Sequence, residues 1–366
     1  MSHSSSLQIR NATDAEFSQL LPVLLAQLTD DERDQKRDFL LNAPPKSMAP
    51  WCREPHATQQ NFRGGLWVAQ STDSPGPSSA AGPRTATGPL ALIWAHPAPG
   101  KTVLLGRPQS LSWSRESCEA QADPPHLEIQ FELVRQATQW ASAIDCEMLQ
   151  AVAEADDQAF QSALERHSIR KLVDLIYLSS PILEPSAVAR SPGSKLQLEV
   201  LPPRPENLKR WYSVIESTYL DSRDCPALQG HRSMPSVVSG YRATGTEWEN
   251  GWVILRPPDS PIPVILPSPS NKLNPDQTND LGCFILADHP AHDFVELVYF
   301  GLVPAARGQG LGVQILAEIE ASAKRLGRSR IIAAVDRKNL PALRVYAAAN
   351  YVVLEERSVF ARFFTV

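Results

Sequence analysis

A glycine-rich turn follows an apolar segment in the last quarter of the chain. Residues 295–303 are mostly apolar, Pro304 ends that segment, and Gly308, Gly310 and Gly312 come next. Glycine has no Cβ atom, so such a backbone can come close to a phosphate group. If a helix begins here, the N–H groups of its first turn point at the anion, and the positive helix end favours negative charge. The turn therefore predicts a pyrophosphate-binding site.

Other phosphate-binding turns have spacings that this chain lacks. The sequence has no G-x-G-x-x-G fingerprint, no Gly-Lys-Ser or Gly-Lys-Thr after the turn, and no convincing acidic residue about 20 positions downstream. A dinucleotide or nucleoside triphosphate site is therefore disfavoured. The alternative without any ligand is a plain strand-to-helix turn.

A second motif lies downstream, in Asn339-Leu-Pro-Ala-Leu-Arg-Val-Tyr-Ala-Ala-Ala-Asn-Tyr351. Residues 307–312 resemble motif A of the GNAT superfamily of acetyltransferases, which has Arg or Gln, two residues, Gly, one residue, and Gly or Ala. The downstream segment resembles the family's second signature, an Asn, an Ala, a Tyr, and a closing small residue with an aromatic. The resemblance covers residues 196–366 well, and the first half only by its order of elements.

The resemblance implies a coenzyme A site. Backbone amides of the turn would surround the pyrophosphate, and backbone groups of the preceding strand would bind the pantetheine arm. Asn339 would cap the following helix, contact the coenzyme, or both. The turn residues are Arg307, Gly308, Gln309, Gly310, Leu311 and Gly312, and the strand residues are Gly301, Leu302 and Val303.

Two side chains are candidates for proton transfer. The phenol of Tyr346 can donate a proton to the departing coenzyme A thiolate, or be a buried aromatic that holds a helix to the sheet. Glu296 lies eleven residues before Arg307, where several family members keep a catalytic glutamate. It can act as general base, or point to solvent on the other strand face. His292 and Asp293 are weaker substitutes.

These features predict direct transfer of an acetyl group from acetyl-CoA to a primary amine in a ternary complex. The acceptor would be a small molecule or a peptide, and no metal is required. The chief alternative is a catalytically silent coenzyme A-binding regulatory module. A longer acyl group or a hydroxyl acceptor is a third possibility. The loop 219–226 falls where the family often forms the acceptor-site wall, although a solvated loop is an equal interpretation.

Composition excludes several other classes of function. A net charge of −5 and the lack of a basic stripe argue against nucleic acid as a partner. No segment reaches the roughly 18 to 20 apolar residues needed to span a membrane, so we expect a cytoplasmic protein. The five cysteines (Cys52, Cys118, Cys146, Cys225 and Cys283) are scattered without metal spacing, which favours reduced thiols.

The elements that must position the site alternate between strands and helices. In the first half we expect a helix at 14–28, strands at 65–70, 90–96 and 102–105, a helix at 126–143, a strand at 148–153, a helix at 156–167 and a strand at 171–178. In the second half we expect a strand at 196–201, a helix at 205–219, and strands at 251–255, 283–286 and 294–303. A helix after the glycine turn, a strand at 330–335, a helix at 341–349 and two closing strands at 351–355 and 359–364 follow.

Both halves end in the same order of elements, which suggests a diverged internal duplication. We therefore expect an α/β fold with two GNAT-like domains, each a mixed, mostly antiparallel twisted sheet flanked by helices. Proline-rich residues 181–194 are the predicted linker between a domain at 1–180 and a catalytic domain at 195–366. The first domain would be a degenerate copy, because residues 104–118 lack the glycine turn. The oligomeric state is left open.

Overall fold

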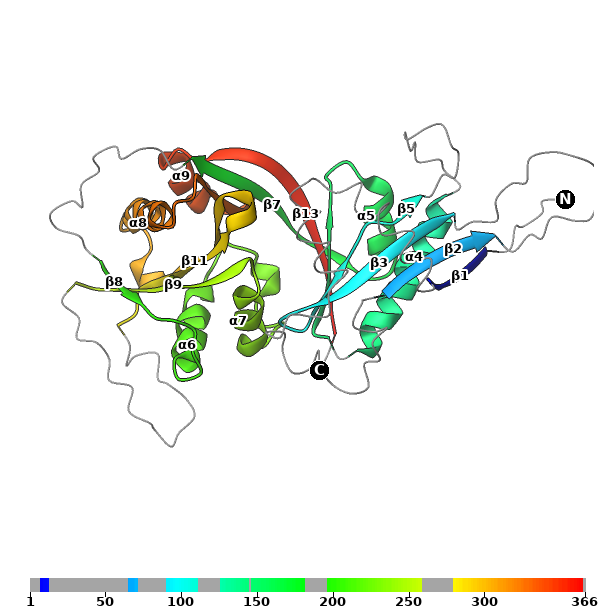
Figure 1. The fold of residues 1–366 in the computed structure, drawn as a ribbon, viewed down its shortest axis with the longest axis horizontal. Helices are drawn as coiled ribbons and strands as arrows, with labels where there is room; N and C mark the ends of the chain where they lie inside the picture. Colours follow the sequence, from blue (N-terminus) through cyan, green and yellow to red (C-terminus); the bar gives the residue numbers. More distant parts are fainter. Residues whose placement is uncertain are drawn as a thin grey trace, which may run out of the picture. The chain divides into compact units, whose positions relative to one another are not determined.

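The computed structural model describes residues 7–12, 65–71, 90–110, 126–144, 146–181, 196–258 and 279–364. The expected helix at 14–28, Cys52 and Cys118 lie outside this part of the chain. The same is true of most of the predicted linker at 181–194. Contacts divide the chain into two compact units, whose helices and strands are labelled in Figure 1. Unit 1 comprises residues 1–172 and 358–366, and unit 2 comprises residues 173–357.

The division between the units falls inside strands. Strand β7 (Arg170–Pro181) gives most of its length to unit 2, while the last residues of β13 (Val352–Phe363) belong to unit 1. The sequence instead places the division in the proline-rich segment that begins at residue 181. A proline-rich stretch marks where periodicity stops, whereas contacts decide with which core a strand packs.

Unit 1 is a mixed sheet that packs against two helices. In the sheet, β1 to β4 are antiparallel neighbours, β4 runs parallel to β6, and β6 is antiparallel to the end of β13. Leu133 and Ala137 of α4 are fully buried, and Trp140 meets Trp67 edge to face at 5.7 Å. Its elements are β1 (Leu7–Asn11), β2 (Gly65–Ser71), β3 (Ala91–Ala98), β4 (Thr102–Leu105), β5 (Gln109–Ser110), α4 (His126–Ala143), β6 (Met148–Ala153) and α5 (Gln158–Arg166).

Unit 2 contains the glycine turn. Its sheet has the order β8, β9, β10, β11, β12, β7, and all neighbours are antiparallel except β11 and β12. Its elements, besides β7 and β13, are β8 (Gln197–Val200), α6 (Leu208–Tyr219), α7 (Met234–Arg242), β9 (Thr246–Arg256), β10 (Gly282–His289), β11 (Phe294–Leu302), α8 (Leu311–Arg325), β12 (Arg330–Asp336) and α9 (Leu340–Ala348). The α/β fold class expected from the sequence is confirmed.

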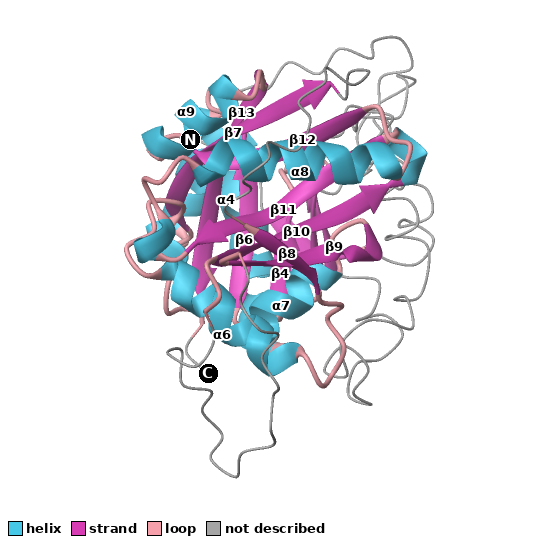
Figure 2. Cartoon of the chain, turned by 90° about the vertical axis from the view of Figure 1, so that its left-hand side faces the viewer, coloured by secondary structure: helices cyan, strands magenta, loops and turns pink. Residues whose placement is uncertain are grey.

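Both faces of the unit 2 sheet are covered by helices. Alternate residues of a strand point to opposite faces. Accordingly, Leu255 and Phe284 pack with α8 and α9, whereas Ile254 and Cys283 pack with α6 and α7. Figure 2 shows α8 crossing one side of the strands, with α6 and α7 on the other. Near-continuous apolar strands such as 282–287 follow from this double burial.

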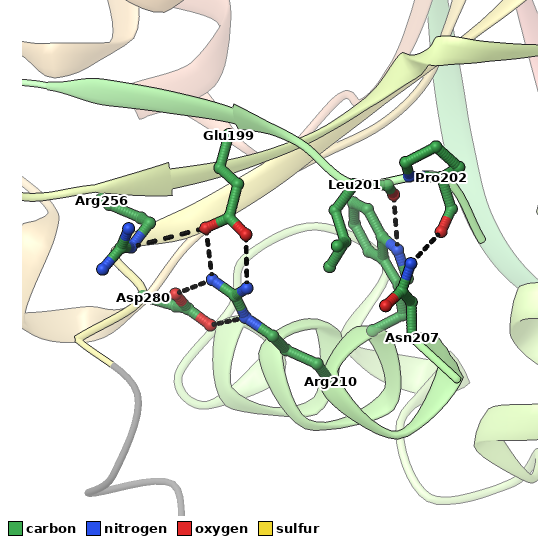
Figure 3. Close-up of polar contacts among 8 residues, drawn as sticks. Glu199, Leu201, Pro202, Asn207, Arg210, Arg256 and Asp280 are labelled. Atoms are coloured by element: carbon green, nitrogen blue, oxygen red, sulfur yellow. Dashed lines mark hydrogen bonds and ion pairs between the residues drawn. The ribbon is translucent and has the colours of Figure 1, made fainter. Parts of the chain in front are cut away.

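Helix α6 is fixed to the sheet by a buried arginine. The Arg210 guanidinium, 2% exposed, makes bidentate ion pairs with Glu199 of β8, at 2.7 and 2.8 Å, and with Asp280, at 3.0 and 2.8 Å (Figure 3). The indole Nε1 of Trp211 donates to the Leu201 carbonyl at 3.0 Å. Bidentate pairs hold one geometry, so the amino-terminal end of α6 has a defined place on the sheet.

Three expectations about elements need correction. The two expected closing strands form one strand, β13, because the charged residues between them stay extended and exposed, and Glu356 accepts from Arg337 at 2.7 Å. Helix α7 was not expected, although Ser233 caps it by accepting from the Ser236 N–H. Strand β9 begins at Thr246 rather than 251. No helix in the described part of the chain is long and apolar enough to span a bilayer.

Candidate active site

Strands β11 and β12 run together and then part. Their parallel register extends from Phe294 opposite Arg330 to Leu297 opposite Ala333. On its other edge, β11 carries a bulge: Leu286 pairs with Leu297 and Ile285 with Tyr299, so Val298 is the extra residue. A bulge bends its strand and increases the local twist. The strands therefore separate at the bulge, although β11 continues to Leu302 and β12 to Asp336.

The glycine turn leads from the end of β11 into α8. A short 3₁₀ turn at Pro304–Ala306 precedes Gly308 (φ 73°) and Gly310 (φ 75°), the N-cap residue of α8. Both are in the left-handed region that favours glycine, and a Cβ atom on either would meet nothing within 4 Å. The backbone at the start of α8 thus borders open space, and Gly310, Leu311 and Gly312 line a cavity. Gly312 differs, because a Cβ atom there would lie 2.8 Å from Val345 Cγ1 of α9.

Arg307 is a structural part of this turn. Its guanidinium donates to the backbone carbonyls of Leu302, Asp221 and Thr218, each at 2.9 Å. These bonds join the turn to the end of β11 and to the segment after α6. The Gln309 amide is exposed and donates to the Ala305 carbonyl at 2.7 Å. Both side chains therefore shape the turn, and its backbone amides are left to face a ligand.

A cavity of about 800 Å³ extends from the glycine turn to the gap between β11 and β12 and on to α6 and α7. Of the predicted site residues, Val303, Gln309 and Glu296 are not part of its wall. The others lie on the wall: Gly301, Leu302, Arg307, Gly308, Gly310, Leu311, Gly312, Asn339 and Tyr346.

Tyr346 and Asn339 come from α9. The Asn339 side chain caps the helix by accepting from the Ala342 N–H at 3.3 Å. Tyr346 is 7% exposed, packs edge to face on Tyr351 at 5.1 Å, and lies on the cavity wall. Burial, together with the nearby charge of Asp224, raises the pKa of the Tyr346 phenol. The phenol of this wall residue is thus protonated at neutral pH.

Glu296 lies elsewhere on β11. Its Oε2 atom is 2.9 Å from Nε2 of His289, and its side chain is 35% exposed. The register explains this pair, because Glu296 is opposite Ala287 on β10 and His289 follows two residues later. Its substitutes His292 and Asp293 are in the short connection before β11, where Asp293 has a φ of 55°.

Comparisons with known proteins agree with this geometry. Residues 277–351 match the acetyltransferase (GNAT) family model. This segment of the chain is thereby assigned to the GNAT family of acetyltransferases. A sequence comparison with curated proteins gives no match.

Solved structures show how far the GNAT likeness extends. A GCN5-related N-acetyltransferase from Sphaerobacter thermophilus has a TM-score of 0.56 at 11% identity, with 98% of this chain and 95% of that chain covered. The glucosamine N-acetyltransferase region of a fungal multi-domain GH3 β-N-acetylglucosaminidase has a TM-score of 0.53 at 11% identity and covers 98% of this chain and 38% of that chain. A tandem GNAT protein of the clavulanic acid pathway has a TM-score of 0.48 at 13% identity, with 98% of each chain covered. At such identities these likenesses concern the fold alone.

The sequence interpretation of this GNAT chain missed an aspartate on the cavity wall. Asp224 accepts from the Asp336 N–H at 3.0 Å and from the Asn339 side chain. In return, Asp336 accepts from the Cys225 N–H at 3.2 Å. Asp224 is an exposed residue by accessible surface, but neighbouring protein groups partly desolvate its carboxyl, and this desolvation raises its pKa. The only sequence signal was its place in the loop 219–226.

The GNAT cavity also has an aromatic end. Tyr219 of α6, Tyr241 of α7 and Tyr299 of β11 lie on its wall. Tyr241 stacks on Tyr299 at 5.3 Å, and Tyr219 meets Tyr299 edge to face at 5.9 Å. These residues are far apart in sequence, so no local pattern could bring them together.

The cysteine of this cavity is a poor nucleophile. Burial and the nearby charges of Asp224 and Asp336 raise the pKa of the Cys225 thiol, which keeps it protonated. Cys283 is fully buried, and burial likewise raises its pKa. No group of three or more potential metal ligands occurs among the described residues.

Proposed function

We propose that unit 2 binds acetyl-CoA and transfers its acetyl group directly to a primary amine in a ternary complex. One observation carries the proposal: the gap between β11 and β12 and the open N-terminus of α8 belong to one cavity. A helix N-terminus suits an anion, and a parted strand edge suits an extended arm that needs backbone hydrogen bonds.

The residues fit coenzyme A along its length. The amides at 308–312 would hold the pyrophosphate, and the space beside Gly308 and Gly310 is where a Cβ atom would otherwise project. Gly301 and Leu302 would bind the pantetheine arm through their backbone, at the end of β11 that has parted from β12, whereas Val303, the third residue expected from the sequence, is not on the cavity wall. When bound, acetyl-CoA supplies an activated thioester.

Tyr346 is the proposed acid. A phenol with a raised pKa keeps its proton until a strong base forms next to it, and the departing thiolate is such a base. Glu296 remains the base proposed from its offset in the sequence. It can act only through water or a shift in its pair with His289, because it is not on the cavity wall. The protonated Cys225 thiol favours direct transfer over an acyl-enzyme intermediate.

Calorimetry and a thiol-release assay test the proposal. We expect acetyl-CoA to bind the wild-type protein and free coenzyme A to appear only when an amine is added. Tyr346→Phe should lower kcat by about 100-fold or more, with little change in the KM of acetyl-CoA. Tyr351→Phe is the matched control, because Tyr351 is buried beside Tyr346 but is not part of the cavity wall.

Two outcomes would contradict the proposal. If acetyl-CoA does not bind, the coenzyme site is wrong. If it binds but no amine in a broad panel releases the thiol, the protein is a silent binding module. Equal loss of activity in Tyr346→Phe and Tyr351→Phe would show a packing role for Tyr346 rather than acid catalysis.

A further inference from the structure

We infer that the acceptor is a primary amine on an aromatic or apolar body, with its ammonium group at Asp224 and its body against the tyrosine wall (Tyr219, Tyr241 and Tyr299). The inference rests on the proposed function and deepens it. It assigns the acceptor half of the cavity and adds Asp224 as a catalytic residue.

The tyrosine wall is effectively apolar because its hydroxyl groups are already paired. The hydroxyls of Tyr219 and Tyr241 lie 3.1 Å apart, and the Tyr299 hydroxyl is 2.6 Å from Thr218 Oγ1. A paired hydroxyl gains little from a polar ligand, whereas the ring faces and edges remain available for contact. Val237, Met234 and Leu228 extend this apolar surface on the same side of the cavity. A body that buries apolar area is therefore preferred over a strongly hydrated one.

Asp224 stands between this wall and the proposed acid. Its charge acts on Tyr346 of α9 and on both Tyr219 and Tyr299 of the wall. An ammonium held there would touch a carboxylate and lie near aromatic rings, two environments that attract cations. Its nitrogen would also lie on the side of the cavity that leads to Tyr346. The position thus suits both binding and deprotonation.

The charged and titratable groups around Asp224 define the local field. Asp336 of β12 adds negative charge, and Cys225 is the neighbouring thiol. Two further arginines line the same cavity: Arg223 precedes Asp224, and Arg232 acts on Tyr219 and Tyr241 while its guanidinium donates to the Ser236 carbonyl at 3.3 Å. The carboxylates of Asp224 and Asp336 are the groups that attract an ammonium, and the two arginines oppose them.

The proton and bond changes balance with these groups. The ammonium gives one proton to the Asp224 carboxylate, and the free amine attacks the thioester carbonyl carbon. The C–S bond breaks as the new C–N bond forms, and the sulfur takes the Tyr346 proton. The nitrogen loses its second proton through water, which restores the phenol, and Asp224 releases the first proton to solvent. The net products are an amide, coenzyme A and one proton.

The test compares amines and paired variants by thiol release. We expect kcat/KM for benzylamine to exceed that for ethanolamine by at least about tenfold, since its phenyl ring buries more apolar area than a hydroxyethyl chain does. Asp224→Asn keeps an oxygen that accepts from the Asp336 N–H, and we expect it to lower kcat/KM for benzylamine by about 100-fold. Glu216→Gln, on the exposed face of α6, is its control.

A second pair tests the wall independently of Asp224. Tyr219 and Tyr212 are on the same helix and pack on the same cluster, but only Tyr219 lies on the cavity wall. Tyr219→Ala should raise the KM for benzylamine by about tenfold and leave the KM for acetyl-CoA unchanged. Tyr212→Ala should change neither constant.

The outcomes separate this inference from the proposed function. If ethanolamine is the better acceptor, or if Asp224→Asn keeps wild-type kcat/KM while Glu296→Gln loses it, the inference is wrong and the acetyltransferase stands. If no amine is acetylated although acetyl-CoA binds, both are wrong. A Tyr219→Ala variant that matches Tyr212→Ala would also overturn the tyrosine wall.

Discussion

Gly310 and Gly327 form a natural pair of sites for testing the coenzyme position. They lie at opposite ends of α8, with φ angles of 75° and 74°, and a Cβ atom at either would meet nothing within 4 Å. Replacing either with alanine puts an L-residue into the left-handed region without a protein clash. Only Gly310 lies on the cavity wall. Any difference between the two variants therefore reports on what occupies the cavity.

Gly310→Ala and Gly327→Ala, at the two ends of α8, should lose the same amount of folding stability. An L-residue in this conformation costs about 1–2 kcal/mol, and each kcal/mol lowers Tm by about 2–4 °C in a unit of 150–250 residues. At Gly310 the new methyl group would also keep the pyrophosphate from the amides at the start of α8. A hydrogen bond to a charged group contributes about 1.5–3 kcal/mol, so losing one should weaken acetyl-CoA binding about 10- to 150-fold.

Differential scanning calorimetry and isothermal titration calorimetry measure the two effects separately. We expect Gly310→Ala and Gly327→Ala to share a similar loss of Tm, whereas only Gly310→Ala loses affinity for acetyl-CoA. Equal affinities in the two variants, with both folded, would refute the placement of the pyrophosphate at the start of α8.

Four further substitutions or conditions have expected outcomes that follow from the contacts. Arg307→Lys cannot donate to three carbonyls in the same fork geometry, so calorimetry should show both a lower Tm and weaker acetyl-CoA binding. Arg210→Met leaves the buried Asp280 carboxylate without its partner, and Glu199 keeps only its 3.6 Å contact with Arg256, so the variant should cost about 3–5 kcal/mol in urea unfolding. Because the pKa of Asp224 is raised, the wild-type kcat/KM should rise with pH over a pH range that lies above the ordinary pKa of an aspartate. The Asp224→Asn variant should not show this rise. At pH values above the rise, its Tm should not be lower than that of the wild type, because desolvation makes the folded state favour the protonated carboxyl. Burial lowers the pKa of His96 to about 3. Only the unfolded chain then binds a proton between pH 6.5 and 3, so unit 1 should lose up to about 1.4 kcal/mol per pH unit in that range. Hydrogen exchange in β3 measures this loss, and His96→Leu should remove it.

Local features of the chain were predicted well because their causes are local. The spacing of apolar residues predicts the helix at 126–143 and the strand at 148–153 with the bounds that the structure has. The glycine turn and the start of α8 also follow from a few adjacent residues. Gly327 and Asn350 have φ angles of 74° and 62°, in the left-handed region that glycine and asparagine tolerate best. Backbone conformation at such positions depends mainly on the residue itself.

Features that depend on distant contacts were missed or incomplete. A charged stretch around Glu355 suggested a break, yet β13 continues through it. The offset of Glu296 from Arg307 placed it on β11, but the register beside β10 brings it to His289 rather than to the cavity wall. Asp224 was one of several polar residues in a loop. Its contact with Asn339 depends on a chain separation of more than a hundred residues.

The sequence by itself determined the glycine turn, the capped helix that carries Tyr346, and the resemblance to GNAT acetyltransferases, because each is encoded in a short run of residues with restricted backbone conformations. Tertiary structure alone decided that the Arg307 guanidinium bonds the backbone, that three tyrosines form a wall, and that Asp224 faces the cavity. The physical reason is that burial, charge and hydrogen-bond partners of a side chain are set by the elements packed around it. In this protein the elements that surround the cavity include α6, α7, β11 and α9.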